Sequence, residues 1–265
     1  MADTSATPEA LHDLAIDLAR AAGTLAADMS TQARTNPKAK ATPTDLVTAG
    51  DIAAERQIVE GILAARPNDS ILGEEGAAVV GDSGVRWHID PIDGTRNYVQ
   101  AIPMWCVSIA AEVDGQIVAG AVFNPSLDEM FHASIGQGAW CDDRRLWCSN
   151  RTELANTIVA TGFARPIETR AHQGQVIAQL LPHIADLRRI GSAALDLCFV
   201  ADAQVDIYFE QGLNQWDLAA GSLIATEAGA QVGNLHGGPM DNNFGMAAPP
   251  ALFDQAKALL IEFGA

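Results

Sequence analysis

The sequence is poor in cysteine and contains no Cys-x-x-Cys pair. Its four cysteines are too sparse for a disulfide framework in a chain of 265 residues. We therefore expect Cys106, Cys141, Cys148 and Cys198 to be unpaired, mostly buried thiols in a reducing cytoplasm.

Two kinds of apolar segment are also missing. Residues 1–10 lack the cationic start and following apolar run of a secretory signal. No stretch approaches the ~20 uninterrupted apolar residues of a membrane-spanning helix. We therefore expect a cytoplasmic protein that has no membrane partner.

Basic residues are scarce as well. The chain has 16 Lys and Arg against 33 Asp and Glu, a net charge of −17, which opposes attraction to nucleic acid or anionic lipid. An acidic enzyme still handles a phosphorylated substrate when its carboxylates hold divalent cations, because the metal is then the largest local charge. The charge argues against polyanion binding and is compatible with a metal-dependent phosphatase.

The chain has enough apolar material for a substantial core, with 48% hydrophobic residues. It has no internal repeat and no long low-complexity linker, only short turn-rich breaks. We expect one domain over residues 1–265, with an N-terminal α+β half at about 1–150 and a C-terminal α/β half at about 151–265.

The hydrophobic period of the N-terminal half changes from helical to extended. Apolar residues recur at helical spacing from residue 8 to about residue 30 and predict a helix with one buried face. After a basic, polar break at 35–40, a second helix is predicted to begin near Asp51 and to end near Pro67, which cannot continue it. Strands are predicted at 71–73, 85–89, 104–113, 116–123 and 129–134.

The C-terminal half alternates between strand and helix patterns. Strands are predicted at 157–161, near Arg188 and at 205–209, and helices at 175–181, 192–201 and 216–228. The two halves therefore indicate different sheets joined in one body.

The most informative segment is Asp-Pro-Ile-Asp-Gly-Thr at 90–95, between an apolar strand and a helix-like stretch. Asp90 and Asp93 can point into one cleft, and their oxygens are hard ligands of the kind that Mg²⁺ prefers. Gly94 lets the backbone approach a ligand, and its amide and that of Thr95 lie at a helix start suited to phosphate. Asp-Pro and Asp-Gly are also common turn dipeptides, so each alone has an ordinary explanation.

Two further acidic positions lie at element ends. Glu74 and Glu75 follow an apolar strand, where only one of two adjacent side chains on an extended chain would enter a given cleft. Asp217 opens an apolar helix. The plainer alternatives are a solvated loop pair for the glutamates and a helix-capping role for Asp217. Together with Asp90 and Asp93, these acids are the ingredients of an oxygen-ligand site for more than one cation.

Five motifs make the chain resemble the inositol monophosphatase family, within the lithium-sensitive metal-dependent phosphatase superfamily. They are residues 40–51, 73–75, 90–95, 191–194 and 215–220. The resemblance spans nearly the whole chain, and the order and spacing of Asp-Pro-Ile-Asp-Gly-Thr and Trp-Asp-x-Ala-Ala-Gly are highly specific. It implies an α+β, layered αβαβα fold in which mixed sheets are sandwiched between helix layers, as in sugar phosphatases.

The resemblance also implies a metal site with two to three Mg²⁺ ions. Glu74, Asp90 and Asp93 would be direct metal ligands, with an oxygen from the Ile92 carbonyl. Asp217 would bind the second cation. Glu75 would be a nearby supporting acid.

The catalytic and substrate roles follow from the same resemblance. Asp51 and Thr95 would orient and deprotonate the attacking water, which a metal held by Glu74 activates. The amides of Gly94 and Thr95 would hold the phosphate. Glu210 would accept a hydrogen bond from a sugar or cyclitol hydroxyl, and the remaining substrate contacts would come from Gly191, Ser192, Ala193 and Asp217.

By this resemblance the chain is expected to hydrolyse a small phosphate monoester without a covalent enzyme intermediate, and to be a lithium-sensitive homodimer. Inositol 1-phosphate is the favoured substrate because residues 189–196 and 206–212 are similar to the inositol-type branch. Histidinol phosphate, fructose 1,6-bisphosphate and a 3′-phosphonucleotide remain alternatives. A non-catalytic regulatory protein on the same fold is the alternative from another class, and the intact carboxylates argue against it.

Overall fold

The computed structural model of the chain describes residues 6–33, 38–39 and 46–265. Most of the polar break predicted at 35–40, and residues 40–45 of the first family motif, lie outside the described residues. A short antiparallel ribbon of β1 (Lys38–Ala39) and β2 (Leu46–Val47) precedes the second helix.

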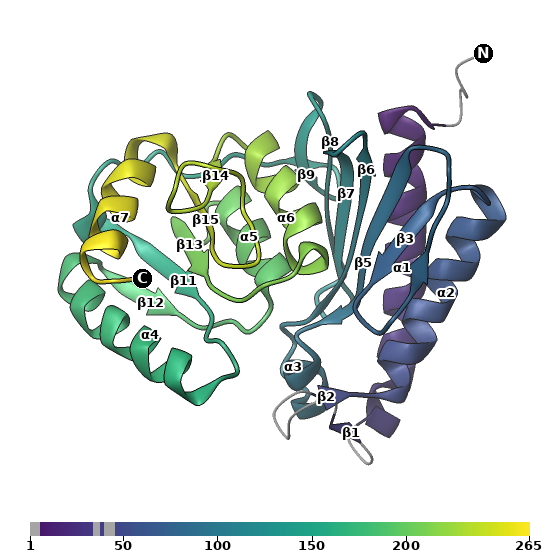
Figure 1. Cartoon of the computed structure of the whole chain (residues 1–265), viewed down its shortest axis with the longest axis horizontal. Coiled ribbons are helices and arrows are strands. Elements are labelled where there is room, and N and C mark those ends of the chain that lie inside the picture. Colours follow the sequence, from purple (N-terminus) through teal and green to yellow (C-terminus); the bar gives the residue numbers. More distant parts are fainter. Residues whose placement is uncertain (1–5, 34–37, 40–45) are drawn as a thin grey trace.

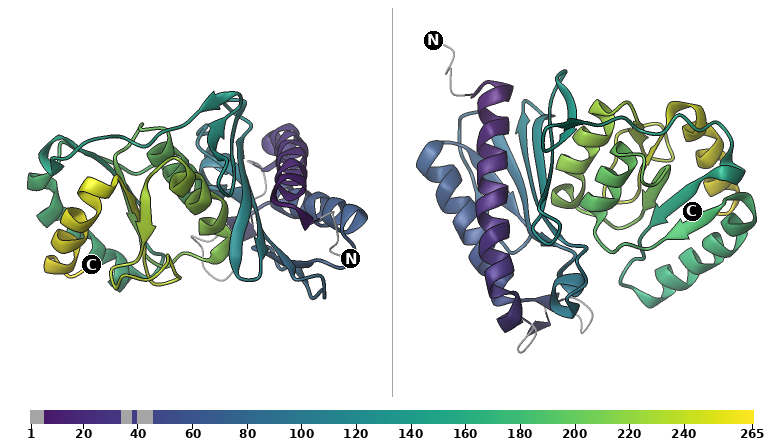
Figure 2. Two further views of the ribbon diagram at one scale, coloured as in Figure 1. Left: turned by 90° about the horizontal axis from the view of Figure 1, so that it is seen from above. Right: turned by 180° about the vertical axis from the view of Figure 1, so that it is seen from behind.

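The N-terminal half is an eight-stranded sheet covered on one face by two helices, α1 (Pro8–Ala33) and α2 (Ala49–Ala65) (Figures 1 and 2). The strand order is β10-β9-β8-β7-β6-β5-β3-β4, and β3 with β5 is the one parallel pair among the described strands of this sheet. The strands are β3 (Ser70–Gly73), β4 (Ala78–Val79), β5 (Val85–Asp93), β6 (Cys106–Val113), β7 (Gln116–Asn124), β8 (Glu129–Ser134), β9 (Gly138–Cys141) and β10 (Arg144–Arg145). The short helix α3 (Thr95–Gln100) follows β5.

The C-terminal half is a five-stranded sheet of order β12-β11-β13-β15-β14, in which β11 pairs in parallel with β12 and β13. Its strands are β11 (Ile158–Thr161), β12 (Asp186–Arg188), β13 (Ile207–Glu210), β14 (Gln231–Gly233) and β15 (Gly245–Ala248). Its helices are α4 (Ile167–Leu180), α5 (Ala193–Ala201), α6 (Gln215–Glu227) and α7 (Pro250–Glu262), with short 3₁₀ turns at Leu154–Asn156 and Leu181–His183.

The elements stack in five layers. Figure 1 shows α1 and α2 outside the larger sheet, α5 and α6 between the two sheets, and α4 and α7 outside the smaller sheet. Three apolar clusters fill the spaces between these layers, because each sheet buries both of its faces. The predicted αβαβα fold with mixed sheets is therefore confirmed.

Helix α6 of the C-terminal half lies directly on the larger sheet, because β7 has a glycine at the contact. A Cβ atom built on Gly120 would lie 3.0 Å from the Cα atom and 3.1 Å from the carbonyl oxygen of Ala220. A larger side chain would have to push the helix backbone away from the strand. This close contact carries the N-terminal end of α6, and with it Asp217, toward β5.

Several predicted boundaries differ from the structure. Helix α4 begins at Ile167 rather than near residue 175, since its first turns are mostly exposed and polar and carry little apolar periodicity. Strand β5 does not end at residue 89 but continues to Asp93. Strands β14 and β15 and helix α7 were not predicted.

Two predictions concern features that the chain is expected to lack, namely disulfides and membrane-spanning helices. All four cysteines are free, and three of them are buried, as expected. Among the residues described, no helix has the length and apolar character needed to cross a membrane.

Candidate active site

A cleft of about 1060 Å³ lies between the two halves of the molecule. Residues from both halves line it, including the ends of β5 and β13, the starts of α3 and α6, and the loop before α5. The site residues predicted from the sequence that line it are Glu74, Asp90, Ile92, Asp93, Gly94, Thr95, Gly191, Ala193, Glu210 and Asp217.

The parallel pairing of β3 and β5 brings the first acids together. Gly73 lies opposite Ile89, so Glu74 and Asp90 follow at the same edge of the sheet. A β-bulge interrupts the pairing of β5 with β6 between Asp90 and Asp93, at Pro91, which has no N–H to donate to the ladder. The Ile92 amide instead donates to Asp90 Oδ1 at 3.0 Å.

Two helix starts position the other two aspartates. The Asn214 amide donates to Asp217 Oδ2 at 2.6 Å in a capping box at the start of α6. Asp93 Oδ2 accepts from the Ser192 hydroxyl at 2.6 Å and from the Ala194 amide at 2.8 Å, at the start of α5. Asp217 therefore caps its helix, as the plainer interpretation holds, and also lines the cleft. The Ser192 hydroxyl contacts Asp93.

The three aspartates form a compact group of oxygen donors. Asp90, Asp93 and Asp217 each offer one carboxylate oxygen, and these oxygens all lie within 4.8 Å of one another. Carboxylates at this spacing repel one another unless protons or cations intervene. An all-oxygen donor set of this kind fits hard divalent cations.

The titration of the group reflects this crowding. Burial, followed by the charges of Glu74, Asp93 and Asp217, raises the pKa of Asp90 well above its ordinary value. Burial raises the pKa of Asp93 to about 6, although its hydrogen bonds from Ser192 and Ala194 act in the opposite direction. Burial and the charge of Asp93 likewise raise the pKa of Asp217 well above normal. Burial and mutual repulsion thus favour the protonated forms of these aspartates more than in an exposed carboxyl group.

Asp51 and Thr95 contact each other, and of the two only Thr95 is among the residues that line the cleft. Asp51 is fully buried in the first turn of α2, where its Oδ2 accepts from the Thr48 amide at 2.8 Å and the Thr48 hydroxyl at 2.6 Å. The Thr95 hydroxyl donates to Asp51 Oδ1 at 3.4 Å or to the Ile92 carbonyl at 3.1 Å. Burial raises the pKa of Asp51 to about 6. The structure therefore brings the predicted pair together.

Glu210 lies across the cleft at the end of β13. Its Oε2 accepts from the Tyr208 hydroxyl at 3.0 Å. Burial raises the pKa of Glu210 to about 7, against the lowering effects of Arg189 and of the Tyr208 hydrogen bond. Its position next to the cleft leaves it available to a bound ligand.

Sequence reasoning missed Glu55, a buried acid of α2. Its Oε2 accepts from the Glu75 amide at 2.8 Å and its Oε1 from the Ala77 amide at 3.0 Å. It therefore fixes the turn that carries Glu74. Its sequence position, 20 residues earlier, gave no signal of this role because the contact depends on how α2 packs on the sheet.

Replacing Glu55 should weaken metal binding without touching the cluster directly. We expect Glu55→Ala to raise the Mg²⁺ concentration for half-maximal activity by ~10- to 100-fold, the range for residues that orient metal ligands. Glu55→Gln, which keeps one acceptor, should lose less. Glu60→Ala on the same helix, where Glu60 pairs with Arg56 at the surface, is the matched control. Equal Mg²⁺ requirements for Glu55→Ala and the control would contradict this role.

Sequence reasoning also missed four cleft-lining arginines, Arg96, Arg165, Arg170 and Arg189. They are exposed and come from three separate segments. Arg189 lowers the pKa of Asp93 and of Glu210, so its charge reaches both walls of the cleft. The cleft of this acidic protein thus combines a carboxylate cluster with basic residues.

Comparisons with known proteins agree with this geometry. The model of the inositol monophosphatase family matches residues 7–260. The chain is 44% identical over 237 residues to an inositol-1-monophosphatase of Mycobacterium leprae, covering 85% of this chain and 81% of that protein. It is 44% identical over 196 residues to a protein named Nus factor SuhB from Pasteurella multocida, covering 73% of each. The solved structure of Mycobacterium tuberculosis SuhB superimposes with a TM-score of 0.85 at 36% identity, covering 98% of both chains.

Proposed function

Because the chain belongs to the inositol monophosphatase family and is a phosphatase, we propose that it hydrolyses inositol 1-phosphate to inositol and phosphate and requires Mg²⁺. The observation that carries the proposal is the convergence of Asp90, Asp93 and Asp217 oxygens within 4.8 Å in a cleft shared by both halves. Relatives named inositol-1-monophosphatase at 42–44% identity support the substrate.

The metal ligands would be Glu74, Asp90, Asp93 and Asp217, with the Ile92 carbonyl, holding two to three Mg²⁺ ions. The pKa values of the three aspartates are raised by burial and because nearby basic side chains do not balance their negative charges. Bound cations would supply that balance. When bound, Mg²⁺ stabilises charge on the phosphoryl and ester oxygens and lowers the pKa of a coordinated water.

Thr95 and Asp51 would take the proton of the attacking water. The Thr95 hydroxyl has one hydrogen, and when it donates to Asp51 its lone pairs can accept from water. Asp51, with a pKa near 6, is mostly ionised at neutral pH and basic enough to share that hydrogen. The Thr48 cap keeps its other oxygen occupied, so Oδ1 remains directed at Thr95.

The phosphate and the alcohol would bind on different walls. Gly94 adopts φ 88°, and the first amides of α3 have no partner within the helix, so they can donate to phosphoryl oxygens. Glu210, on the opposite wall, would accept from hydroxyls of the leaving alcohol, near Gly191 and Ala193, which line the cleft on either side of the buried Ser192. The cleft arginines would attract the substrate dianion against the net charge of −17.

A regulatory role without catalysis is the alternative, because some relatives carry the name Nus factor SuhB. The cleft retains the acids and the Asp51–Thr95 contact that turnover needs, and this favours catalysis. We further infer a lithium-sensitive homodimer from the family, a cytoplasmic location from the free cysteines, and no nucleic-acid partner from the net charge of −17.

The test is a comparison of four substrates with Mg²⁺ and with excess chelator. We expect the highest kcat/KM on inositol 1-phosphate, lower values on histidinol phosphate, fructose 1,6-bisphosphate and a 3′-phosphonucleotide, and no turnover with chelator. A higher value on histidinol phosphate would overturn the substrate. Full turnover in chelator would overturn the metal requirement, and no turnover on any substrate would favour the regulatory alternative.

A further inference from the structure

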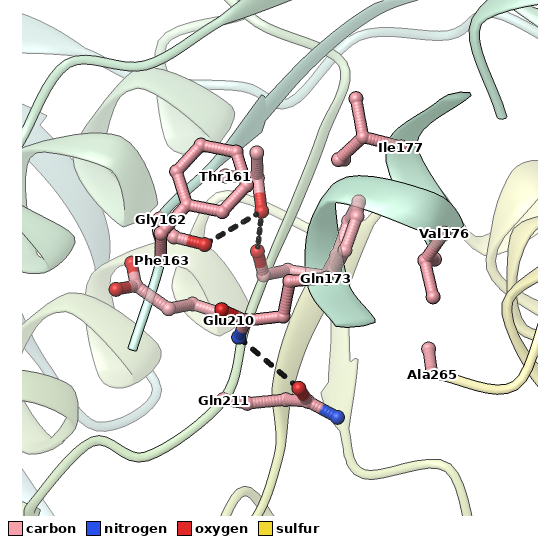
Figure 3. A pocket seen from close by; sticks show the side chains of 10 residues that line it. Thr161, Gly162, Phe163, Gln173, Val176, Ile177, Glu210, Gln211 and Ala265 are labelled. Atoms are coloured by element: carbon pink, nitrogen blue, oxygen red, sulfur yellow. Dashed lines mark hydrogen bonds between the residues drawn. The ribbon is translucent and has the colours of Figure 1, made fainter. Parts of the chain in front are cut away.

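The wall of the cleft that carries Glu210 is built from two adjacent parallel strand ends. In the pairing of β11 with β13, Thr161 lies opposite Phe209. The Thr161 hydroxyl donates to the Phe209 carbonyl at 2.7 Å, which ties the two ends together (Figure 3). Gly162 and Glu210 are the next residues along the two strands, so they lie side by side just beyond the last paired residues.

Gly162 provides a notch that the Glu210 carboxylate occupies. A Cβ atom built on Gly162 would lie 1.9 Å from Oε1 and 2.0 Å from Cδ of Glu210. Such distances are far inside van der Waals contact, so only glycine at position 162 allows Glu210 its present rotamer. Figure 3 shows the Glu210 side chain passing beside Gly162 and away from Gln211.

The space on the other side of this wall is small. Buried Gln173 of α4 donates to Gln211 Oε1 at 3.1 Å (Figure 3). It also accepts from the Ala164 amide at 2.9 Å, so it holds both segments that flank the notch. The cavity between them measures about 10 Å³, room for no more than a water molecule. A displaced Glu210 carboxylate therefore finds little room in this cavity.

We propose that Gly162 is a specificity-determining residue, whose missing side chain seats the Glu210 carboxylate where it accepts hydrogen bonds from a polyol monoester. The proposal rests on the proposed function and deepens it, because it assigns selection for hydroxyl-bearing alcohols to the Gly162–Glu210 pair. A side chain at 162 would move the carboxylate out of the position from which it accepts these hydrogen bonds. The hydrogen bonds that hold Asp93 and Asp217 come from 192–194 and 214, so the cluster would stay in place.

The test is Gly162→Ala, assayed on inositol 1-phosphate and on 4-nitrophenyl phosphate, whose leaving group carries no further hydroxyl. With saturating Mg²⁺, we expect kcat/KM on inositol 1-phosphate to fall at least ~10-fold, mainly through KM, as for loss of a hydrogen bond to a charged group. Activity on 4-nitrophenyl phosphate should change less than about twofold. Gly174→Ala is the matched control, because a Cβ atom there meets no atom within 4 Å. Equal losses on both substrates would overturn the proposal.

A double-variant cycle tests whether the effect passes through Glu210. Gly162→Ala combined with Glu210→Ala should lose no more activity on inositol 1-phosphate than Glu210→Ala alone. If Gly162→Ala folds poorly and the double variant folds well, the clash with Glu210 is supported directly. Additive losses would overturn the proposal. Wild-type protein that cleaves 4-nitrophenyl phosphate but not inositol 1-phosphate would instead refute the proposed substrate, and the role of the notch with it.

Discussion

Asp93→Asn should reduce phosphate release from inositol 1-phosphate by ~10³-fold or more, above the roughly 10- to 100-fold losses typical of residues that only orient metal ligands. Asp93 belongs to the three-aspartate group, and the amide of asparagine is a poorer ligand for a hard cation than a carboxylate. The measurement is kcat at saturating Mg²⁺, together with the Mg²⁺ affinity.

The variant should lose activity while keeping its fold. The asparagine oxygen can still accept from the Ser192 hydroxyl and the Ala194 amide, the two groups that now hold Asp93 Oδ2. Replacement also removes one of several mutually repelling charges, so the metal-free protein should unfold at no lower temperature at pH 7.5. Asp128→Asn, in a surface pair with Arg20, is the control for charge alone. A variant that keeps a tenth of wild-type kcat would rule out Asp93 as a required metal ligand.

The acids of the cluster could be proposed from the sequence because each lies next to the end of a regular element. Glu74 follows β3, Asp90 follows the strand predicted at 85–89, and Asp217 lies in the first turn of α6, so local patterns locate them. The parallel pairing of β3 with β5 places Glu74 and Asp90 at one edge of the sheet. This pairing joins segments that are distant in the sequence, so no local pattern shows it. The family resemblance, rather than periodicity, supplied that step.

Glu55 and Gly162 illustrate what the sequence could not show. Glu55 accepts hydrogen bonds from the amides of residues 75 and 77, a contact that exists because α2 packs on the sheet. Gly162 leaves space for the Glu210 side chain on the neighbouring strand. A glutamate within an amphipathic helix and a glycine after a strand have ordinary explanations when seen alone. The extent of β5 was missed for a related reason, since a proline in a strand is usually a sign that pairing has ended, whereas here the strand continues past a bulge.

Mg²⁺ should stabilise the protein more strongly at pH 7.5 than at pH 5. Asp51 and Asp93 have folded-state pKa values near 6, above the ordinary value of 3.8 in the unfolded chain. The folded protein therefore binds these protons more tightly, and the resulting stability is complete below about pH 4 and is lost as the pH rises through 6. For fully buried Asp51 alone the loss is on the order of 3 kcal/mol. The pKa values of Asp90 and Asp217 are raised well above normal, so their loss of stabilising protons extends the effect to higher pH.

Cations reverse this trend because they bind the deprotonated carboxylates. At pH 7.5 a single Mg²⁺ at a hundredfold excess over its Kd adds ~2.7 kcal/mol of stability, which corresponds to several degrees in Tm for a chain of this size. At pH 5, protons compete for the same oxygens and the increase in Tm should be much smaller. The measurement is Tm with Mg²⁺ minus Tm with chelator at each pH, at equal ionic strength. A difference that is independent of pH would mean that the raised pKa values and the cation site do not involve the same carboxylates.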